Sequence, residues 1–377
     1  MKKRFFAGFI LLFFAAGLFG AQQPWYLMEQ GKRHFRSGAY GDAIIAFEDA
    51  RRERIAQITR KEQDLIHVLT SPIARRLGDS LEMVEMYIAQ RQETGAAAAL
   101  AELYSRVPRE TLQNSVQRAL DELDRLRSYP EAEFWLGEAY RAEGELLLAL
   151  RQYERAWQQR ELLQTPGFEV EILYRLVEVN RLRQNYREME RRALEIIQGS
   201  DLFGQPRDMF WARETAASTH QLRAAMGRIL ENDGIDRFLV LYRYNNIVTE
   251  RAHRFLGFFY HATGRHASAA EHLMFAFLIQ NTILIEDIMR REFDFAYTTL
   301  EDLMNQVRTR PALMNFIEEV EYFRTISYLS SSLFATGRAI PSAQLWAFLA
   351  ASPDAGIWGE RARRSPRPIL ERPIQLP

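Results

Sequence analysis

Histidines are the residues of this sequence that come closest to a metal site. Four of the seven histidines gather in one stretch, at His253, His261, His266 and His272. Two metal ligands on one helix face are separated by three or four residues, whereas these four are eight, five and six residues apart. The spacing therefore predicts packing or surface histidines, and we expect no metal and no other cofactor.

The carboxylates and serines form no catalytic arrangement either. Acidic residues stand among arginines, as in residues 121–125, which is typical of a solvated helix face. Ser330, Ser331 and Ser332 lack the G-x-S-x-G setting of a nucleophile elbow, and neither a P-loop nor a G-x-G-x-x-G is present. We therefore expect a protein that is not an enzyme, with a helical enzyme that carries no motif as the last alternative.

The elements that would position side chains are helices. Apolar residues recur every three or four positions and show no sustained alternation, which predicts an all-α fold. In the stretch from Phe134 to Ala156, small residues alternate with large ones: Leu136, Gly137, Tyr140, Gly144, Ala149 and Tyr153. This spacing predicts two short antiparallel helices that cross closely and are joined by a turn at Gly144.

The same spacing returns twice elsewhere in the chain. Its positions are Gly31, Gly38, Ala43, Phe47 and Ala50 near the start, and Leu256, Gly257, Tyr260, Gly264, Ala269, Leu273 and Ala276 later. The pattern resembles the tetratricopeptide repeat (TPR), a helix–turn–helix unit of about 34 residues with the signature L-G-x2-Y…A-x3-F. The resemblance implies an α-solenoid, a right-handed superhelix whose first helices line a concave groove.

Residues 22–351 are expected to form this solenoid, with clear and degenerate repeats. The clearest repeats are 25–55, 131–160 and 251–280, and the degenerate ones are 78–128, 170–198, 206–245 and 281–351. Some helices are expected to be long: the second helix of the first repeat should continue to Ser71-Pro72, and residues 281–307 and 314–334 each read as one helix. Asn185 is expected to make the turn of the 170–198 repeat.

The two ends of the chain fall outside the predicted repeats. Residues 1–21 combine Lys2, Lys3 and Arg4 with an apolar run from Phe5 to Phe19, which indicates a secretory signal peptide or, as an alternative, an uncleaved N-terminal anchor. Residues 352–377 are expected to form a capping helix at 355–364 and a proline-rich tail.

Composition restricts the compartment and the partners. Lys and Arg balance Asp and Glu at 49 each, so the positive excess typical of nucleic-acid binding is missing. The chain has no cysteine, which suits export to an oxidising compartment. We expect the bacterial periplasm, or an inner-membrane anchor facing it, and membrane contact only through an uncleaved N-terminus.

The resemblance also implies which residues line the groove. A residue one step after the packing glycine is rotated by about 100°, toward the concave side. The positions on this side are Lys32, Phe35, Arg36, Glu138, Arg141, Phe258 and His261. Family members that bind chaperones hold a C-terminal carboxylate with lysines and asparagines there, but this sequence has Glu138 at an asparagine position, so that specificity is not implied.

The expected function is a scaffold or adaptor that holds a segment of another envelope protein in this groove. The alternatives are a transport accessory that encloses a small ligand near Phe293 and Tyr297, and an envelope-assembly factor whose basic tail binds an envelope component. The pattern of export signal, absent cysteine and worn repeats also resembles exported TPR proteins of spirochaetes. The sequence does not indicate an oligomeric state.

Overall fold

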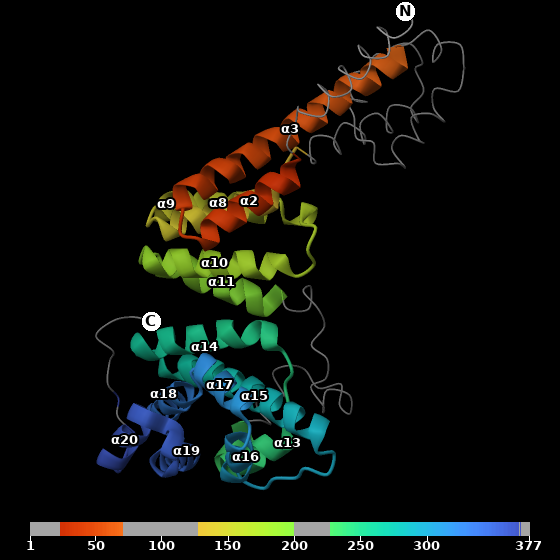
Figure 1. The fold of residues 1–377 in the computed structure, drawn as a ribbon. Helices are drawn as coiled ribbons and strands as arrows, with labels where there is room; N and C mark the ends of the chain where they lie inside the picture. Colours follow the sequence, from red (N-terminus) through yellow and green to blue (C-terminus); the bar gives the residue numbers. More distant parts are fainter. Residues whose placement is uncertain (1–22, 71–126, 200–226, 369, 371–377) are drawn as a thin grey trace, which may run out of the picture. The chain divides into compact units, whose positions relative to one another are not determined.

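The computed structural model describes residues 23–70, 127–199, 227–368 and 370, and every regular element among them is a helix (Figure 1). The predicted all-α class is therefore confirmed for this part of the chain. The predictions for residues 1–21, for most of 78–128, for 206–226 and for the end of the tail lie outside the described residues. The chain divides into two compact units, Met1–Asn185 (unit 1) and Tyr186–Pro377 (unit 2), which are described separately.

Unit 1 is a succession of helix pairs. Its helices are α2 (Pro24–Arg36), α3 (Tyr40–Thr70), α8 (Pro130–Ala142), α9 (Leu146–Gln158), the short 3₁₀-helix η1 (Arg160–Leu162) and α10 (Phe168–Leu182). Helix α2 packs on α3, α3 on α8, α8 on α9 and α9 on α10, so neighbours in the described sequence are neighbours in space. Pro24 and Pro130 start α2 and α8, where the missing N–H leaves no bond unmade. Helix α3 is helical through Thr70, as predicted from the pattern.

The packing glycines of the sequence lie where two helices touch. A Cβ built on Gly31 would come within 2.4 Å of the Phe47 ring, and one on Gly137 within 2.5 Å of the Tyr153 ring. In unit 2 a Cβ on Gly257 would come within 2.4 Å of Leu273. The large residue follows the glycine by sixteen positions in each case. The predicted contact of small against bulky residues is confirmed in these pairs, and no larger side chain fits at the glycines without a shift.

The turns between paired helices also repeat. Gly38, Gly144, Gly264 and Gly337 all have φ between 77° and 84°, which is costly for residues with a Cβ. The residue after each turn donates its N–H to the carbonyl five residues earlier, as Glu145 does to Tyr140 at 2.8 Å. This is the Schellman closure of a helix. In the pair at 170–198 the left-handed residue is Gln184, with φ of 58°, and not the predicted Asn185.

Apolar side chains from three helices form the core at the start of unit 1. They are Leu27, Met28, Ala43, Phe47, Ala50, Ala132, Leu136 and Ala139. Phe35 and Trp135 cover this cluster, with ring centroids 5.7 Å apart. Since α2, α3 and α8 all contribute, the first pair completes its core only with the next helix.

Unit 2 continues with helix pairs and adds shorter helices. Its helices are α11 (Tyr186–Gln198), α13 (Gly234–Leu241), α14 (Ile247–Ala262), α15 (His266–Arg291), α16 (Leu300–Arg308), α17 (Pro311–Glu319), α18 (Tyr322–Ala335), α19 (Ala339–Ala351), η3 (Pro353–Ala355) and α20 (Gly356–Arg364). Helix α11 packs on α14, α14 on α15, α15 on α18 and α18 on α19. Helix α20, which lies in the segment expected to form a capping helix, packs on α19.

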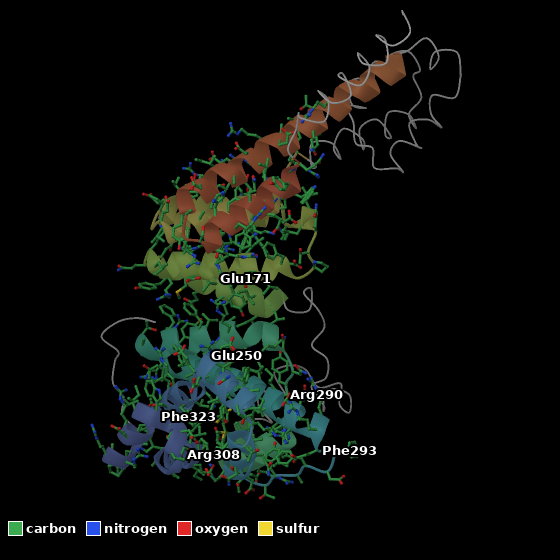
Figure 2. All side chains as sticks on the ribbon, viewed as in Figure 1. Glu171, Glu250, Arg290, Phe293, Arg308 and Phe323 are labelled. Carbon is green, nitrogen blue, oxygen red and sulfur yellow. The ribbon has the colours of Figure 1, made fainter. Side chains whose placement is uncertain are left out.

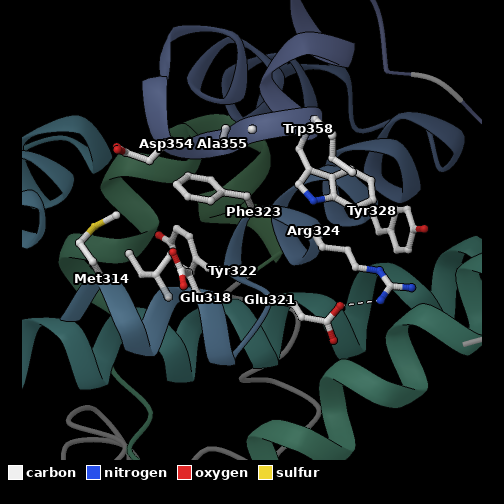
Figure 3. A pocket seen from close by; sticks show the side chains of 13 residues that line it. Met314, Glu318, Glu321, Tyr322, Phe323, Arg324, Tyr328, Asp354, Ala355 and Trp358 are labelled. Carbon is white, nitrogen blue, oxygen red and sulfur yellow. Dashed lines mark hydrogen bonds and ion pairs between the residues drawn. The ribbon is translucent and has the colours of Figure 1, made fainter. Parts of the chain in front are cut away.

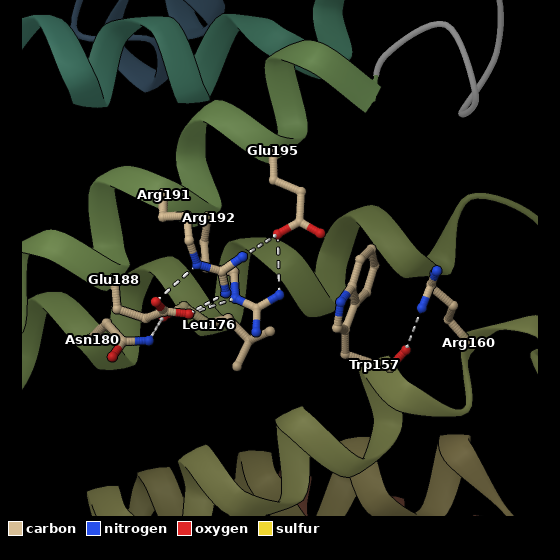
Figure 4. Close-up of polar contacts among 8 residues, drawn as sticks. All are labelled: Trp157, Arg160, Leu176, Asn180, Glu188, Arg191, Arg192 and Glu195. Atoms are coloured by element: carbon tan, nitrogen blue, oxygen red, sulfur yellow. Dashed lines mark hydrogen bonds and ion pairs between the residues drawn. The ribbon is translucent and has the colours of Figure 1, made fainter.

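Helix α11 has a charged surface built from its own residues. Arg191 and Arg192 both pair with Glu188 and Glu195, one turn away on either side (Figure 4). Such pairs at spacings of three and four support a helix weakly, by about 0.3–0.5 kcal/mol each. Arg191 is exposed, whereas Arg192 is buried, so only part of this network faces solvent.

The last helix pair replaces the packing glycine by serine. Ser330 stands at the glycine position of α18, and its Oγ donates to the Ser342 carbonyl of α19 at 2.8 Å. Ser342 Oγ donates to the Ser330 carbonyl at the same distance. Two reciprocal hydrogen bonds thus join helices that still approach closely, which gives these buried serines a structural role.

The prediction of two long helices near the C-terminus is wrong. Residues 281–307 are interrupted, because α15 ends at Arg291 and α16 begins after Thr299, whose hydroxyl accepts from the Asp302 N–H in a capping box. Residues 314–334 are interrupted at Glu321, whose left-handed φ of 50° separates α17 from α18. Both breaks were missed because apolar residues keep the helical spacing through them.

Helix α15 is long and apolar enough to cross a membrane, and it is the only such helix in the described residues. Sixty-seven per cent of its apolar window is buried inside the protein. Its buried polar side chains also have partners: Asn281 accepts from the Tyr322 hydroxyl at 2.9 Å, and Thr282 donates to the Leu278 carbonyl at 2.8 Å. In this structure α15 is the central helix of unit 2.

Candidate functional site

The predicted groove residues of α2 remain accessible. Lys32 pairs with Glu29 at 2.7 Å, and its Nζ lies 5.7 Å from the centre of the Trp135 ring. Phe35 is half-buried between Tyr40 and Trp135, and Arg36 is exposed. These three side chains place a cation, an aromatic face and a second cation on one side of α2, and their binding role stays a prediction.

Glu138 does not face an open groove. It is 5% exposed and accepts hydrogen bonds from the Tyr153 hydroxyl, from Arg175 Nε at 2.6 Å and from Arg141 at 3.3 Å. Burial by itself raises the pKa of this carboxyl, but the bonds from Tyr153 and Arg175 outweigh it and hold the pKa below its usual value. Glu138 therefore joins α8, α9 and α10, and its predicted exposure is wrong.

Arg141 belongs to the same cluster. One of its guanidinium nitrogens faces Glu138, and another reaches Glu178 of α10 at 3.4 Å. Its side chain is 27% exposed, so it lies at the edge of the cluster. Glu138 is buried and Glu178 is partly exposed, and both occupy part of the guanidinium; a binding role for Arg141 stays a prediction.

Phe258 and His261 of α14 are buried against α18, the first helix of the following pair. Phe258 is 3% exposed and packs edge-on against Tyr328 of α18, with centroids 5.3 Å apart. His261 is 2% exposed, stacks on the same tyrosine at 4.5 Å and lies 2.9 Å from Ser332 Oγ. Their predicted exposure in a groove is also wrong, because α14 and α18 pack closely enough to cover these positions.

Burial changes the acid–base behaviour of His261. Desolvation, assisted by the nearby His266, lowers the pKa of His261 to about 4. The imidazole is therefore neutral at neutral pH, and its ring nitrogen shares a hydrogen bond with a hydroxyl. This is a packing histidine, as the sequence spacing indicated.

A pocket that the sequence did not reveal lies in unit 2. It is an open pocket with a volume of about 630 Å³, lined by α17, α18, η3 and the start of α20 (Figure 3). Phe323 lies at its centre, Glu318 and Glu321 on one side, and Trp358 on the side of the capping helix. No spacing rule could have found this pocket, because its walls come from two short helices and a break that the apolar pattern concealed.

Glu321 holds the polar side of this pocket in place. It has a left-handed backbone conformation, which costs a residue other than glycine about 1–3 kcal/mol. Its carboxylate pairs with Arg254 of α14 at 2.8 Å and with Arg324 of α18 at 2.5 Å. The two ion pairs fix the orientation of Arg324, whose guanidinium also lies 4.4 Å from the centre of the Phe258 ring.

A buried carboxylate lies behind this pair. Glu250 is 3% exposed and accepts from Arg254 at 3.0 Å and from Gln280 of α15 at 2.6 Å. Desolvation raises the pKa of Glu250 in spite of Arg254. Arg254 therefore bridges an internal acid and the Glu321 of the pocket, and Glu250 and Phe323 can be followed together in Figure 2.

The region expected to enclose a small ligand is open instead. Phe293 is 90% exposed, in the segment between α15 and α16, and its side chain points away from unit 2 (Figure 2). Tyr297 is turned inward, where its hydroxyl donates to the Leu239 carbonyl at 2.8 Å. These two residues do not line one cavity.

Comparison with known proteins shows a similarity that extends over most of the chain. No family model matches the chain. The chain is similar to an uncharacterised protein of Treponema pallidum (strain Nichols), 25% identical over 341 residues that cover 90% of this chain and 89% of that protein. The similarity thus runs nearly the full length of both chains.

Two features of the described residues offer charged and aromatic side chains to solvent. Among these residues, no group of three or more histidine, aspartate and glutamate side chains is placed to hold a metal ion. The pocket of unit 2 combines acidic side chains with aromatic and aliphatic walls, and α2 carries an exposed basic and aromatic edge. Both are surfaces for polar and apolar contact.

Proposed function

We propose that this chain is a non-catalytic protein-binding scaffold or adaptor of the bacterial periplasm, built from TPR-like helix pairs. One observation carries the proposal: the same close contact, a glycine under a large side chain sixteen residues later, recurs at Gly31, Gly137 and Gly257. Stacked helix pairs of this kind leave one row of helices available for another protein. The groove residue with the most solvent access is Arg36 of α2.

The periplasmic location is supported by sequence features alone. Residues 1–21 have the charge and apolar run of an export signal, and the chain has no cysteine. The relative in Treponema pallidum, a spirochaete, is in keeping with the resemblance to exported TPR proteins of spirochaetes. If the signal is not cleaved, the chain is an inner-membrane protein that faces the periplasm.

The test is reversible chemical crosslinking in the native cell envelope, followed by purification of the chain and mass spectrometry. We expect a defined partner protein, and we expect Arg36→Glu to reduce its recovery. Arg33→Glu is the matched control, because Arg33 is also an exposed arginine of α2 but lies outside the predicted groove positions. Recovery of no partner by the wild-type chain would refute the proposal.

A small-ligand function is the second candidate, favoured by the volume of the pocket in unit 2. At about 630 Å³ the pocket lies within the range of small-molecule sites. Native mass spectrometry distinguishes the two candidates, because a transport accessory would co-purify with a small molecule of constant mass. A scaffold would carry none.

A further inference from the structure

We propose that the pocket between α17, α18 and α20 binds the side chain of a lysine or arginine in a segment of a partner protein. This inference rests on the protein-binding function proposed above and names the chemistry of the partner. None of the groove positions predicted on α2 and α8 lines the pocket, whose lining residues come from α17, α18, η3 and the start of α20.

The charges of the pocket favour a cation. Glu318, Glu321 and Asp354 line it against a single lining arginine, Arg324. Asp354 is already paired with Arg308 at 2.7 Å, and Glu321 holds two arginines. Glu318 is exposed and has no ion pair or hydrogen-bond partner for its side chain among the described residues. An incoming ammonium or guanidinium group would therefore meet a free carboxylate.

Arg324 is not positioned to attract an anion. It donates to Glu321 at 2.5 Å, and its guanidinium lies over two rings, 4.4 Å from the Phe258 centroid and 5.4 Å from that of Tyr328. Because this guanidinium already donates to a carboxylate and stacks on aromatic rings, few of its N–H groups can bind a carboxylate of a ligand. The pocket thus presents the unmatched charge of Glu318.

The apolar walls suit a long basic side chain. Met314, Ile317 and Phe323 line the pocket, and Phe323 lies at its centre with 8% of its surface exposed. Lysine and arginine bury aliphatic stems along such surfaces while the charged group stays near polar atoms. A small inorganic cation would leave these walls without contact.

The rim indicates that the cation belongs to a protein. Ile357 lines the pocket and is 62% exposed, and the Trp358 beside it is half-buried. If the ligand were a free cation inside the pocket, it would make no contact with an isoleucine exposed at the edge of the pocket. The isoleucine can contact the residues on either side of a basic side chain, and burying it against a partner segment would remove apolar surface from water.

The experiment uses the full-length chain and isothermal titration calorimetry. The probes are blocked octapeptides of alanine and glycine with one central arginine, lysine or norleucine, together with free agmatine. We expect the arginine and lysine peptides to bind about tenfold more tightly than the norleucine peptide, as the loss of one charge-assisted bond implies. The arginine peptide should also bind more tightly than agmatine, and Ile357→Ser should remove that difference.

Glu318→Gln should weaken binding of the arginine peptide about tenfold, whereas Glu319→Gln should leave it unchanged. Glu319 is the matched control because it is the next exposed glutamate of α17 and does not line the pocket. Both side chains are exposed, so equal melting temperatures would exclude misfolding as the cause.

Three results would overturn the inference: equal binding of the arginine and norleucine peptides, unchanged binding after Glu318→Gln, or agmatine binding as tightly as the peptide. In each of these cases a partner protein crosslinked in the envelope would leave the scaffold function standing. The absence of any such partner would instead refute the scaffold itself.

Discussion

Gly137 of α8 lies directly against the ring of Tyr153 in α9, so closely that a Cβ on Gly137 would come within 2.5 Å of a ring carbon. The hydroxyl of the same tyrosine donates to Glu138, the residue after the glycine. One tyrosine thus fills the space beside Gly137 and also bonds to the buried charge cluster. The relationship explains why the pair needs a glycine and a tyrosine at a fixed spacing.

Replacing the packing glycines should destabilise the fold. Gly31→Ala, Gly137→Ala and Gly257→Ala should each lower the free energy of unfolding by about 1–3 kcal/mol, because the added methyl group would overlap Phe47, Tyr153 or Leu273. Urea unfolding followed by circular dichroism measures the change.

Gly41→Ala is the matched control for these variants. Gly41 is helical in α3, and its Cβ would meet nothing closer than 3.9 Å. We expect it to be neutral or to stabilise by up to about 1 kcal/mol. If Gly137→Ala behaved like Gly41→Ala, the close contact would not be a structural requirement.

The buried cluster around Glu138 should depend on Arg175. Arg175→Met should cost about 3 kcal/mol, because it removes the closest cation from a carboxylate that is 5% exposed. Arg191→Met should cost less than about 1 kcal/mol, since Arg191 pairs on an exposed surface of α11.

A double variant separates the charge from the packing in this cluster. Glu138→Gln combined with Arg175→Met should be less destabilised than the sum of the single variants, because neither charge is then left alone. Additive losses in chemical denaturation would show that the two residues do not act as a pair.

Stability should fall in mild acid through His261. The pKa of His261 is about 4 in the folded protein and about 6.5 in the unfolded chain, so the unfolded state binds the proton first as the pH falls. The folded state therefore loses stability between about pH 6.5 and pH 4, by an amount on the order of 3 kcal/mol. Below the lower pKa this contribution stops growing.

Comparing unfolding free energies at pH 7 and pH 4 tests this assignment. His261→Gln should reduce the difference between the two values, whereas His34→Gln, at an exposed position of α2, should leave it as in the wild-type chain. An unchanged difference in His261→Gln would assign the acid sensitivity to other groups.

The serine contact of the last pair offers a milder test. Ser342→Ala removes the hydrogen bond to the Ser330 carbonyl and should cost about 1 kcal/mol. Ser365→Ala, at a half-buried serine after α20 whose hydroxyl donates only to the nearby Arg367 carbonyl, should cost less. A shift in melting temperature that is equal for both variants would argue against a structural role for the reciprocal pair.

The spacing of small and large residues was sufficient to predict the helix pairs. It was insufficient to predict which neighbouring helices cover each pair. The positions of Gly31, Gly137 and Gly257 and the turns at Gly38, Gly144 and Gly264 follow from contacts within one pair, which the sequence records at fixed offsets. The left-handed Gln184 was missed because glutamine, unlike glycine, is not a residue type that indicates a positive φ.

The candidate sites were harder to predict because burial of a side chain depends on the neighbouring helices. Phe258 and His261 occupy groove positions by spacing, yet α18 covers them, and Arg175 of α10 covers Glu138. The pocket at Glu318 depends on the break at Glu321, which the continuous apolar pattern concealed. The charge and spacing of residues in the sequence predicted which residue types lie at these positions, but not whether their side chains are exposed.

The central claim is that the exposed edge of the first helix pair touches another protein in the envelope. Photo-crosslinking in living cells tests it most directly, with p-benzoylphenylalanine placed at residue 36 in one strain and at residue 33 in another. We predict a discrete protein adduct from position 36 that is absent or much weaker at position 33. Equal labelling at both positions, or no protein adduct at position 36, would contradict the account.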